Sequence, residues 1–131
     1  MAGITARFWR ESSRRYRGEA AKSPLTGKVY FPGRLIEPGN HNRTFETVKL
    51  NYDGTLLTYT IIRVAPRGFE RSSPYALGII ELDDGGRITS QIADTPLDKI
   101  QIGMRVRVEF RKIIDDSPEG LHMYGYKVVP A

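Results

Sequence analysis

Few residues in this sequence could do acid–base, nucleophilic or metal chemistry. The 131 residues include no cysteine and two histidines, which excludes disulfides, thiolate zinc sites and a cysteine nucleophile. Neither His41 nor His122 has a second metal-ligating residue two to four positions after it. Two pairs of adjacent aspartates, at 83–84 and 115–116, fall in turn-like segments, where Asp is favoured for its hydrogen bonds to the backbone. We therefore expect neither a catalytic site nor a metal site.

The basic residues are distributed unevenly along the chain. Residues 1–34 carry eight Lys or Arg against two acidic residues, whereas residues 35–131 carry twelve against thirteen. Such an asymmetry is typical of a segment that meets an anionic partner, whether a nucleic acid, a phosphate-bearing ligand or an acidic protein surface.

An amphipathic helix is expected to position these arginines. It is predicted from Thr5 or Ala6 to about Arg17, with Gly18 as its natural end. At about 100° per residue, its aromatic side chains and its arginines fall on opposite sides. The arginine side is either a solvated face or a surface for phosphates and acidic side chains. Because so short a helix is marginal alone, its aromatic side must dock on this chain or on another.

The rest of the sequence is typical of β-structure. Residues 20–42 are rich in Pro, Gly and Lys, which predicts a small hairpin or an irregular connection around the apolar run at 29–31. A single helical turn is expected at 95–100. Alternation of apolar with polar residues, or enrichment in β-branched residues, predicts strands at 44–50, 56–64, 75–82, 87–93, 104–112 and 121–129.

These elements fit a mainly β fold. The N-terminal helix and the hairpin would precede a closed barrel of the OB type with five to six strands, and a β-sandwich is the alternative. The first residues contain no apolar stretch long enough for a signal peptide or a membrane span, so we expect a cytoplasmic protein without a membrane partner.

One predicted loop, at 65–75, is long for a compact domain. It carries Arg67 and Arg71 and places Phe69 between a glycine and a charged residue. Loops of this length are uncommon unless they bind something, so we expect a contact loop, with a flexible connection as the alternative.

Several short segments follow one another in a characteristic order. They are Arg7-Phe8-Trp9-Arg10-Glu11, Gly27-Lys28-Val29-Tyr30-Phe31-Pro32, Gly68-Phe69, Pro74-Tyr75-Ala76-Leu77 and Ile102-Gly103-Met104. Each segment alone is weak evidence. With its segments in this order over nearly the whole chain, the sequence resembles the acyl-CoA-associated OB-fold family, long known as a domain of unknown function. The resemblance implies an N-terminal helix over residues 1–19, a ribbon hairpin over 20–42 and an OB-fold domain over 43–131.

In this family the ribbon typically holds zinc through two pairs of cysteines, and this sequence departs from that pattern. Ser23 and Thr26 stand at the positions of the first pair, and Glu37 and Asn40 at those of the second. A set of Ser, Thr, Glu and Asn is a poor zinc site. We therefore expect a degenerate ribbon that keeps its hairpin and has lost its metal.

The resemblance also implies a function. Proteins of this family commonly accompany thiolase-like enzymes, and the sequence is most similar to the branch that bridges acetoacetyl-CoA thiolase and hydroxymethylglutaryl-CoA synthase in the archaeal mevalonate pathway. It implies a noncatalytic scaffold in a hetero-oligomer with both enzymes, which helps to bind CoA or to pass acetoacetyl-CoA between active sites. No cofactor would be tightly bound, since CoA would be shared with the partner. Such channelling works by effective concentration and requires no chemistry by the bridge.

Under this hypothesis two surfaces are assigned. CoA presents phosphates at one end and a slim apolar arm at the other, which suits the loop at 65–75. The CoA-binding residues are then Arg67, Phe69, Arg71 and Tyr75, and the residues that dock on a partner are Phe8, Trp9 and Tyr16, with Arg7, Arg10, Arg14 and Arg17 at an acidic rim.

The main alternative is an OB-fold protein that binds single-stranded nucleic acid. Tyr59, Tyr124 and Tyr126 could stack on bases, although cross-strand packing explains them equally well. The near-neutral charge of residues 35–131 makes nucleic acid the less favoured partner. A stand-alone enzyme ranks third, because no acid–base constellation is present in the sequence.

Overall fold

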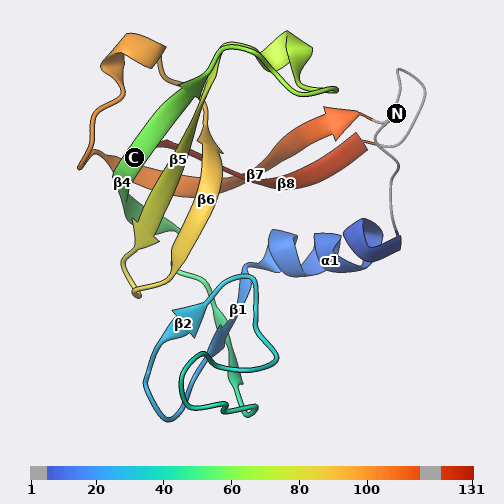
Figure 1. Ribbon diagram of the computed structural model, residues 1–131, viewed down its shortest axis with the longest axis vertical. Coiled ribbons are helices and arrows are strands. Elements are labelled where there is room, and N and C mark those ends of the chain that lie inside the picture. Colours follow the sequence, from blue (N-terminus) through green and yellow to red (C-terminus); the bar gives the residue numbers. More distant parts are fainter. Residues whose placement is uncertain (1–5, 116–121) are drawn as a thin grey trace.

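The computed structural model describes the backbone of residues 6–115 and 122–131 and the side chains of residues 10–113 and 124–131. The chain begins with one helix and a small sheet (Figure 1). The helix and the strands of this sheet, which has the order β2-β1-β3, are α1 (Ala6–Arg17), β1 (Glu19–Lys22), β2 (Val29–Tyr30) and β3 (Glu46–Lys49).

The remaining strands close into a five-stranded barrel with the order β4-β5-β6-β8-β7, which confirms the predicted OB-type fold. The two short 3-10 helices of the described chain lie between barrel strands: η1 (Glu70–Ser72) within the predicted contact loop, and η2 (Leu97–Lys99) where a helical turn was expected. The barrel strands are β4 (Asp53–Ile62), β5 (Tyr75–Leu82), β6 (Arg87–Ile92), β7 (Arg105–Asp115) and β8 (His122–Pro130).

The strand predicted at 44–50 exists as β3, but it lies outside the barrel. It pairs with β1 along its whole length, from Glu19 opposite Lys49 to Lys22 opposite Glu46. Most of β3 is exposed, with Val48 alone half-buried, so this strand is too polar on both faces to line a barrel. The first barrel strand is instead β4, which begins at Asp53, three residues before the strand predicted at 56–64.

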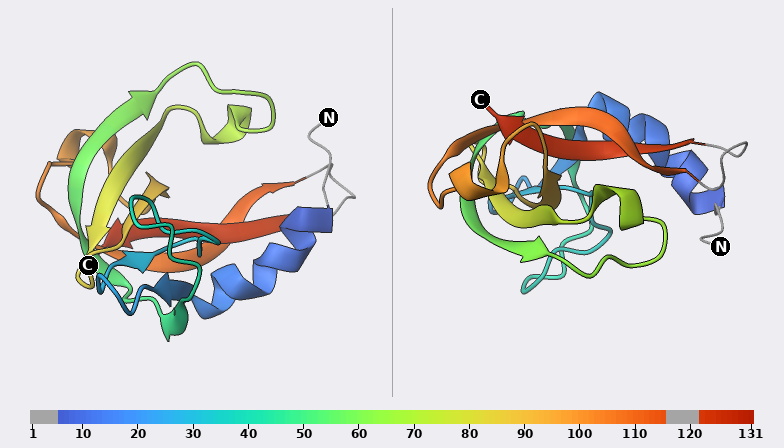
Figure 2. Two further views of the ribbon diagram at one scale, coloured as in Figure 1. Left: turned by 60° about the horizontal axis from the view of Figure 1, so that its bottom comes forward. Right: turned by 90° about the horizontal axis from the view of Figure 1, so that it is seen from above.

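The predicted helix and its end at Gly18 are confirmed. Gly18 has a positive φ of 62°, which ends the helix and sends the chain directly into β1. Figures 1 and 2 show α1 alongside the hairpin of β7 and β8, and α1 contacts β8. Among the described residues, no helix combines the length and the apolar character needed to cross a membrane.

The core lies inside the barrel and continues into the small sheet. On β7, Val106 and Val108 are buried, whereas the alternating charged residues from Arg105 to Arg111 face outward, as their pattern predicts. Phe31, which follows β2, is 8% exposed and packs on Tyr126 of β8 with 5.3 Å between ring centroids. The small sheet is therefore attached to the barrel by a shared apolar contact.

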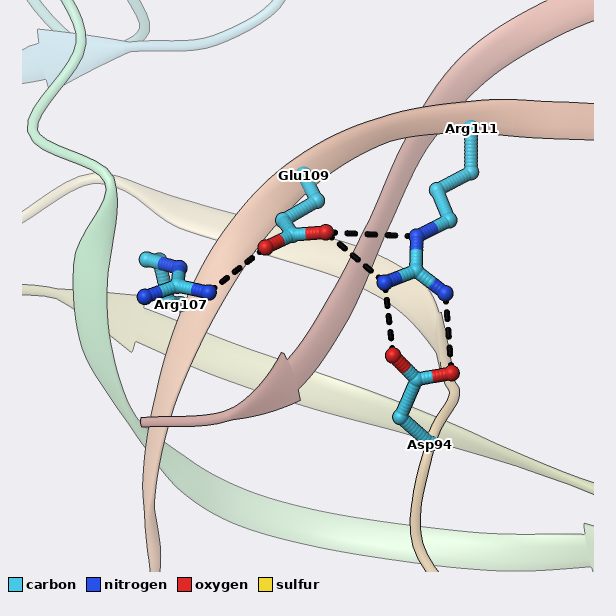
Figure 3. A network of polar contacts seen from close by, with 4 residues as sticks. All are labelled: Asp94, Arg107, Glu109 and Arg111. Atoms are coloured by element: carbon cyan, nitrogen blue, oxygen red, sulfur yellow. Dashed lines mark hydrogen bonds and ion pairs between the residues drawn. The ribbon is translucent and has the colours of Figure 1, made fainter.

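A network of charges covers the outside of the barrel where β6, β8 and β7 meet (Figure 3). Arg111 of β7 pairs in bidentate fashion with Asp94, at 2.6 and 2.8 Å, and with Glu109 at 2.8 Å. Hydrogen bonds from Arg111 lower the pKa of Asp94. Asp94 follows β6, so this ion pair joins the two strands that flank β8.

Candidate functional site

Two adjoining clefts lie where α1, the small sheet and the barrel meet. The first, which we name the basic cleft, has a volume of about 460 Å³ and lies between α1 and the segment after β2. Its lining includes the basic residues Arg14, Arg15 and Arg34, the acidic residues Glu11 and Glu19, and the apolar residues Phe31 and Pro32.

Three arginines and two glutamates line the basic cleft, which gives it a formal charge of +1. Arg14 lies 3.9 Å from Glu11, a weak pair that offsets its charge. Arg34 lies over the ring of Tyr30, at 5.2 Å from its centroid, and is exposed. Arg15 lies deeper and also lines the second cleft. Arg15 and Arg34 thus make this cleft a suitable place for an anion.

The second cleft, which we name the apolar cleft, has a volume of about 270 Å³ and opens beside the barrel. Its lining includes Phe69 of the loop at 65–75, Leu77 of β5 and Tyr126 of β8. It shares Arg15 and Pro32 with the basic cleft, so the two clefts are adjacent.

The structure brings together only part of the predicted CoA-binding set. Phe69 and Tyr75 lie close together, with ring centroids 6.1 Å apart, and Phe69 lines the apolar cleft. Arg67 and Arg71 are exposed on the same loop and line neither cleft. Two of the arginines that do line the clefts, Arg15 and Arg34, were marked in the sequence only by their place in the basic N-terminal segment.

The predicted docking helix also makes contacts within this chain. Tyr16 meets Phe110 of β7 edge-on, at 5.2 Å between centroids, and Phe110 stacks on Tyr124 at 5.7 Å. Tyr16 nevertheless stays 66% exposed. Of the arginine face, Arg10, Arg14 and Arg17 are exposed, and Arg17 pairs with Glu19 at 2.8 Å. The side chains of Arg7, Phe8 and Trp9 lie outside the described residues.

The four degenerate zinc positions converge in space. Ser23 donates a hydrogen bond to one carboxylate oxygen of Glu37 at 2.6 Å, and Thr26 donates to the other at 2.5 Å. The amide of Asn40 donates to the first oxygen at 3.1 Å. The two halves of the ribbon are therefore joined by hydrogen bonds to Glu37.

The chemistry of this cluster does not fit zinc. Glu37 is 1% exposed and Ser23 is fully buried, and hydrogen bonds from Ser23 and Thr26 lower the pKa of Glu37 to about 2. The hydroxyl protons point at the carboxylate, so the hydroxyls act as donors, whereas a zinc ligand must offer a lone pair. Within the described part of the chain, no group of three or more His, Cys, Asp or Glu side chains could hold a metal ion.

The architecture is that of a ribbon-like sheet attached to an OB barrel, and comparison with known proteins gives the family. Residues 47–111 match the family model described as ChsH2, C-terminal OB-fold domain. The chain is 41% identical to a DUF35 domain-containing scaffold protein of Methanocaldococcus jannaschii, covering 97% of this chain and 91% of that one. It is 35% identical to the protein of the same description from Methanothermobacter thermautotrophicus, covering 99% and 98%.

The chain belongs to the DUF35 family, whose C-terminal domain is the ChsH2-type OB fold. Its fold is also that of a chain described as Ltp2-ChsH2(DUF35) aldolase, with a TM-score of 0.71 and 22% identity over 99% of this chain and 98% of that one. A DUF35 protein of unknown function from Sulfolobus solfataricus has the same fold, with a TM-score of 0.54 and 12% identity over 98% and 100%.

Proposed function

We propose that this protein is a noncatalytic scaffold subunit of an acyl-CoA-processing enzyme complex. The observation that carries this proposal is its similarity, over nearly the full length of both chains, to proteins described as scaffolds. The sequence offers no reactive constellation, so the protein would act through the surfaces that it presents to larger enzymes.

The partners we propose are acetoacetyl-CoA thiolase and hydroxymethylglutaryl-CoA synthase. The description Ltp2-ChsH2(DUF35) aldolase associates a protein of this fold with an enzyme, which supports an enzyme partner in general. The arginines Arg10, Arg14 and Arg17 on the exposed side of α1 suit an acidic patch on one partner, and Tyr16 offers an aromatic contact beside them.

We further propose that the two adjoining clefts hold part of a CoA molecule at the interface with a partner. Arg15 and Arg34 of the basic cleft suit the phosphates, and the apolar cleft under Phe69 suits the pantetheine arm. Arg67 and Arg71 would then contact the exposed part of the same ligand from the loop.

Native mass spectrometry of the complex tests the partnership. We expect this protein to co-purify from its host with a thiolase and an acyl-CoA synthase in a fixed ratio. Replacement of Arg10, Arg14 and Arg17 by Ala should weaken that assembly, and the same change at Arg43 and Arg63, two exposed arginines outside α1, serves as the control. Recovery of the native protein as a monomer would refute the proposal.

CoA binding by the assembled complex tests the site. We expect Arg15→Ala with Arg34→Ala to reduce CoA affinity roughly tenfold or more, since charge-assisted hydrogen bonds to phosphate are lost. Arg67→Ala with Arg71→Ala should have a smaller effect. If both pairs leave CoA affinity unchanged while the complex stays intact, CoA does not bind at these clefts.

A second candidate function rests on one row of aromatic rings. The ring of Phe110 contacts both Tyr16 and Tyr124, so the three rings form a row in space. Tyr16 is 66% exposed and Tyr124 is 40% exposed. Exposed rings near basic side chains are also typical of single-strand binding. A fluorescence titration with single-stranded oligonucleotides should show no tight binding under the scaffold proposal, whereas tight and salt-sensitive binding would favour this candidate.

A further inference from the structure

The two halves of the ribbon have the same backbone hydrogen-bond pattern. In the first knuckle, residues 23–28, the N–H of the first residue donates to the C=O of the sixth at 2.9 Å, and the N–H of the fifth donates to the C=O of the first at 2.9 Å. In the second knuckle, residues 37–42, the corresponding distances are 2.8 and 3.2 Å. The fifth residue has positive φ in both, 73° at Gly27 and 57° at His41.

The equivalent side chains of the two knuckles meet at Glu37. The first and fourth residues of the first knuckle, Ser23 and Thr26, each donate to a different oxygen of the Glu37 carboxylate. The second knuckle supplies Asn40, at 3.1 Å, and Asn42, at 3.4 Å. One carboxylate therefore accepts hydrogen bonds from both knuckles at once.

Burial makes this cluster more than an ordinary polar turn. Ser23 and Glu37 are 0% and 1% exposed, so neither can exchange its hydrogen bonds for water without opening the ribbon. Ser23 Oγ also accepts from the backbone N–H groups of Leu25 and Thr26, at 3.3 and 3.4 Å, which fixes the turn of the first knuckle. A fifth donor, the hydroxyl of Tyr30 at 3.3 Å, ties the cluster to β2.

The cluster also fixes the segment that lines the basic cleft. Residues 31–36 run between β2 and the second knuckle, and Phe31, Pro32 and Arg34 line that cleft. Tyr30 before this segment and Glu37 after it are joined through the cluster.

We propose that the Glu37 carboxylate is the structural cross-link of this ribbon, taking the place of a metal ion between the two knuckles. It is a positioning residue, which holds residues 31–36 in place through its bonds to both knuckles. This inference does not depend on the proposed function, because it concerns the stability of the ribbon in the isolated protein.

Hydrogen–deuterium exchange of the full chain, followed by mass spectrometry, tests the cross-link. In Glu37→Gln one acceptor oxygen becomes an NH₂ donor that faces other donors, so exchange in residues 23–42 should rise by about tenfold or more. Exchange in the barrel strands β4 to β8 should stay unchanged. Glu46→Gln, on the exposed strand β3 of the same sheet, is the matched control and should change neither.

A second variant separates loss of the cross-link from general damage. If the four side chains converge as described, Ser23→Cys, Thr26→Cys, Glu37→Cys and Asn40→Cys together should create a tetrahedral thiolate site. Without metal, residues 23–42 of this variant should exchange rapidly. When one zinc ion binds per chain, these residues should regain their protection from exchange. Zinc should have no effect on Glu37→Gln.

The outcomes that would overturn the proposal are specific. Equal exchange in Glu37→Gln and Glu46→Gln would show that the carboxylate is not a cross-link. Equal loss of protection in the ribbon and in the barrel would refute a role confined to the ribbon. A four-cysteine variant that neither binds zinc nor regains protection would show that the four positions do not share one centre.

Discussion

At the scale of single residues, Glu37 is an ionised carboxylate in a site that water hardly reaches. Four side chains from two knuckles donate to it, and the hydrogen bonds from Ser23 and Thr26 are the largest causes of its lowered pKa. Burial acts in the opposite direction and is outweighed. Among the described residues, the hydrogen-bond donors to this charge are all neutral.

The lowered pKa predicts how the ribbon responds to acid. The pKa of Glu37 falls from its ordinary value of 4.5 to about 2 in the folded protein. Because the folded value is the lower one, ionised Glu37 stabilises the native state fully above about pH 4.5, and this contribution is lost as the pH falls towards 2. A carbon-13 NMR titration of the side-chain carboxyl should have its midpoint near the lower value.

The control for this prediction is Glu37→Gln, whose free energy of unfolding should depend less steeply on pH in that interval, since the contribution of Glu37 is removed while Asp94 and other carboxyl groups still contribute. A midpoint near 4.5 in the native protein would contradict the described hydrogen bonds.

Residue types alone predicted one of the residues that line the candidate clefts. Phe69 could be singled out because an aromatic side chain in a long polar loop needs an explanation, and the structure places it in a cleft. Arg15 and Arg34 could not be distinguished from the other arginines, since their place in the clefts depends on how α1, the small sheet and the barrel pack together. The resemblance assigned Ser23, Thr26 and Glu37 to one degenerate metal site, but the residue types did not show that hydrogen bonds would join them, over separations of 14 and 11 positions.

At the scale of elements, the strands alternate between core and solvent. On β5, Ile80 is fully buried and packs in the core, whereas its neighbour Ile79 is 40% exposed. Ile80→Ala should therefore lower the free energy of unfolding by about 2–5 kcal/mol, because it leaves a cavity. Ile79→Ala, the matched control, should cost less than about 1 kcal/mol. Urea unfolding of both variants gives the comparison, and equal losses would mean that β5 is misregistered.

The junction of α1 and β1 depends on a glycine for two reasons. Gly18 has positive φ, and a Cβ atom built there would lie 2.8 Å from the Tyr52 ring. Gly27 has a similar φ but nothing within 4 Å. We expect Gly27→Ala to cost about 1 kcal/mol of backbone strain and Gly18→Ala distinctly more. Thermal unfolding measures the difference, and equal costs would show that Tyr52 moves aside freely.

Periodicity predicted the type of most elements but not every strand partner. The alternation of apolar and charged residues from Met104 to Lys112 predicted β7, because such alternation is typical of a strand with one buried face. The pattern at 44–50 predicted a strand as well, but not its partner β1, which also forms the expected hairpin with β2. Pairing is fixed by contacts distant in sequence, which a local pattern does not contain.

At the scale of the whole molecule, the ribbon and the barrel are joined through Phe31 and Tyr126. Phe31→Ala should cost about 3–5 kcal/mol and should separate the unfolding of the ribbon from that of the barrel. Tyrosine fluorescence and far-UV circular dichroism would then report different midpoints. Phe45→Ala, which removes a ring 6.2 Å from Tyr30 within the ribbon, is the control and should leave the midpoints coincident. Coincident midpoints in both variants would contradict the coupling.

The strand order β4-β5-β6-β8-β7 has a consequence for folding kinetics. The first three barrel strands form by hairpins between neighbours, but closure needs β7 to pair with β4, where Asp53 lies opposite Arg107, and β8 to meet β6 at Ile92 and Val128. Both closing contacts join segments far apart in the sequence. The chain therefore loses the entropy of loop closure before strand pairing stabilises it. We expect the β4–β5–β6 meander to form early and insertion of the final hairpin to limit the rate, which mutational φ-values along β7 can measure.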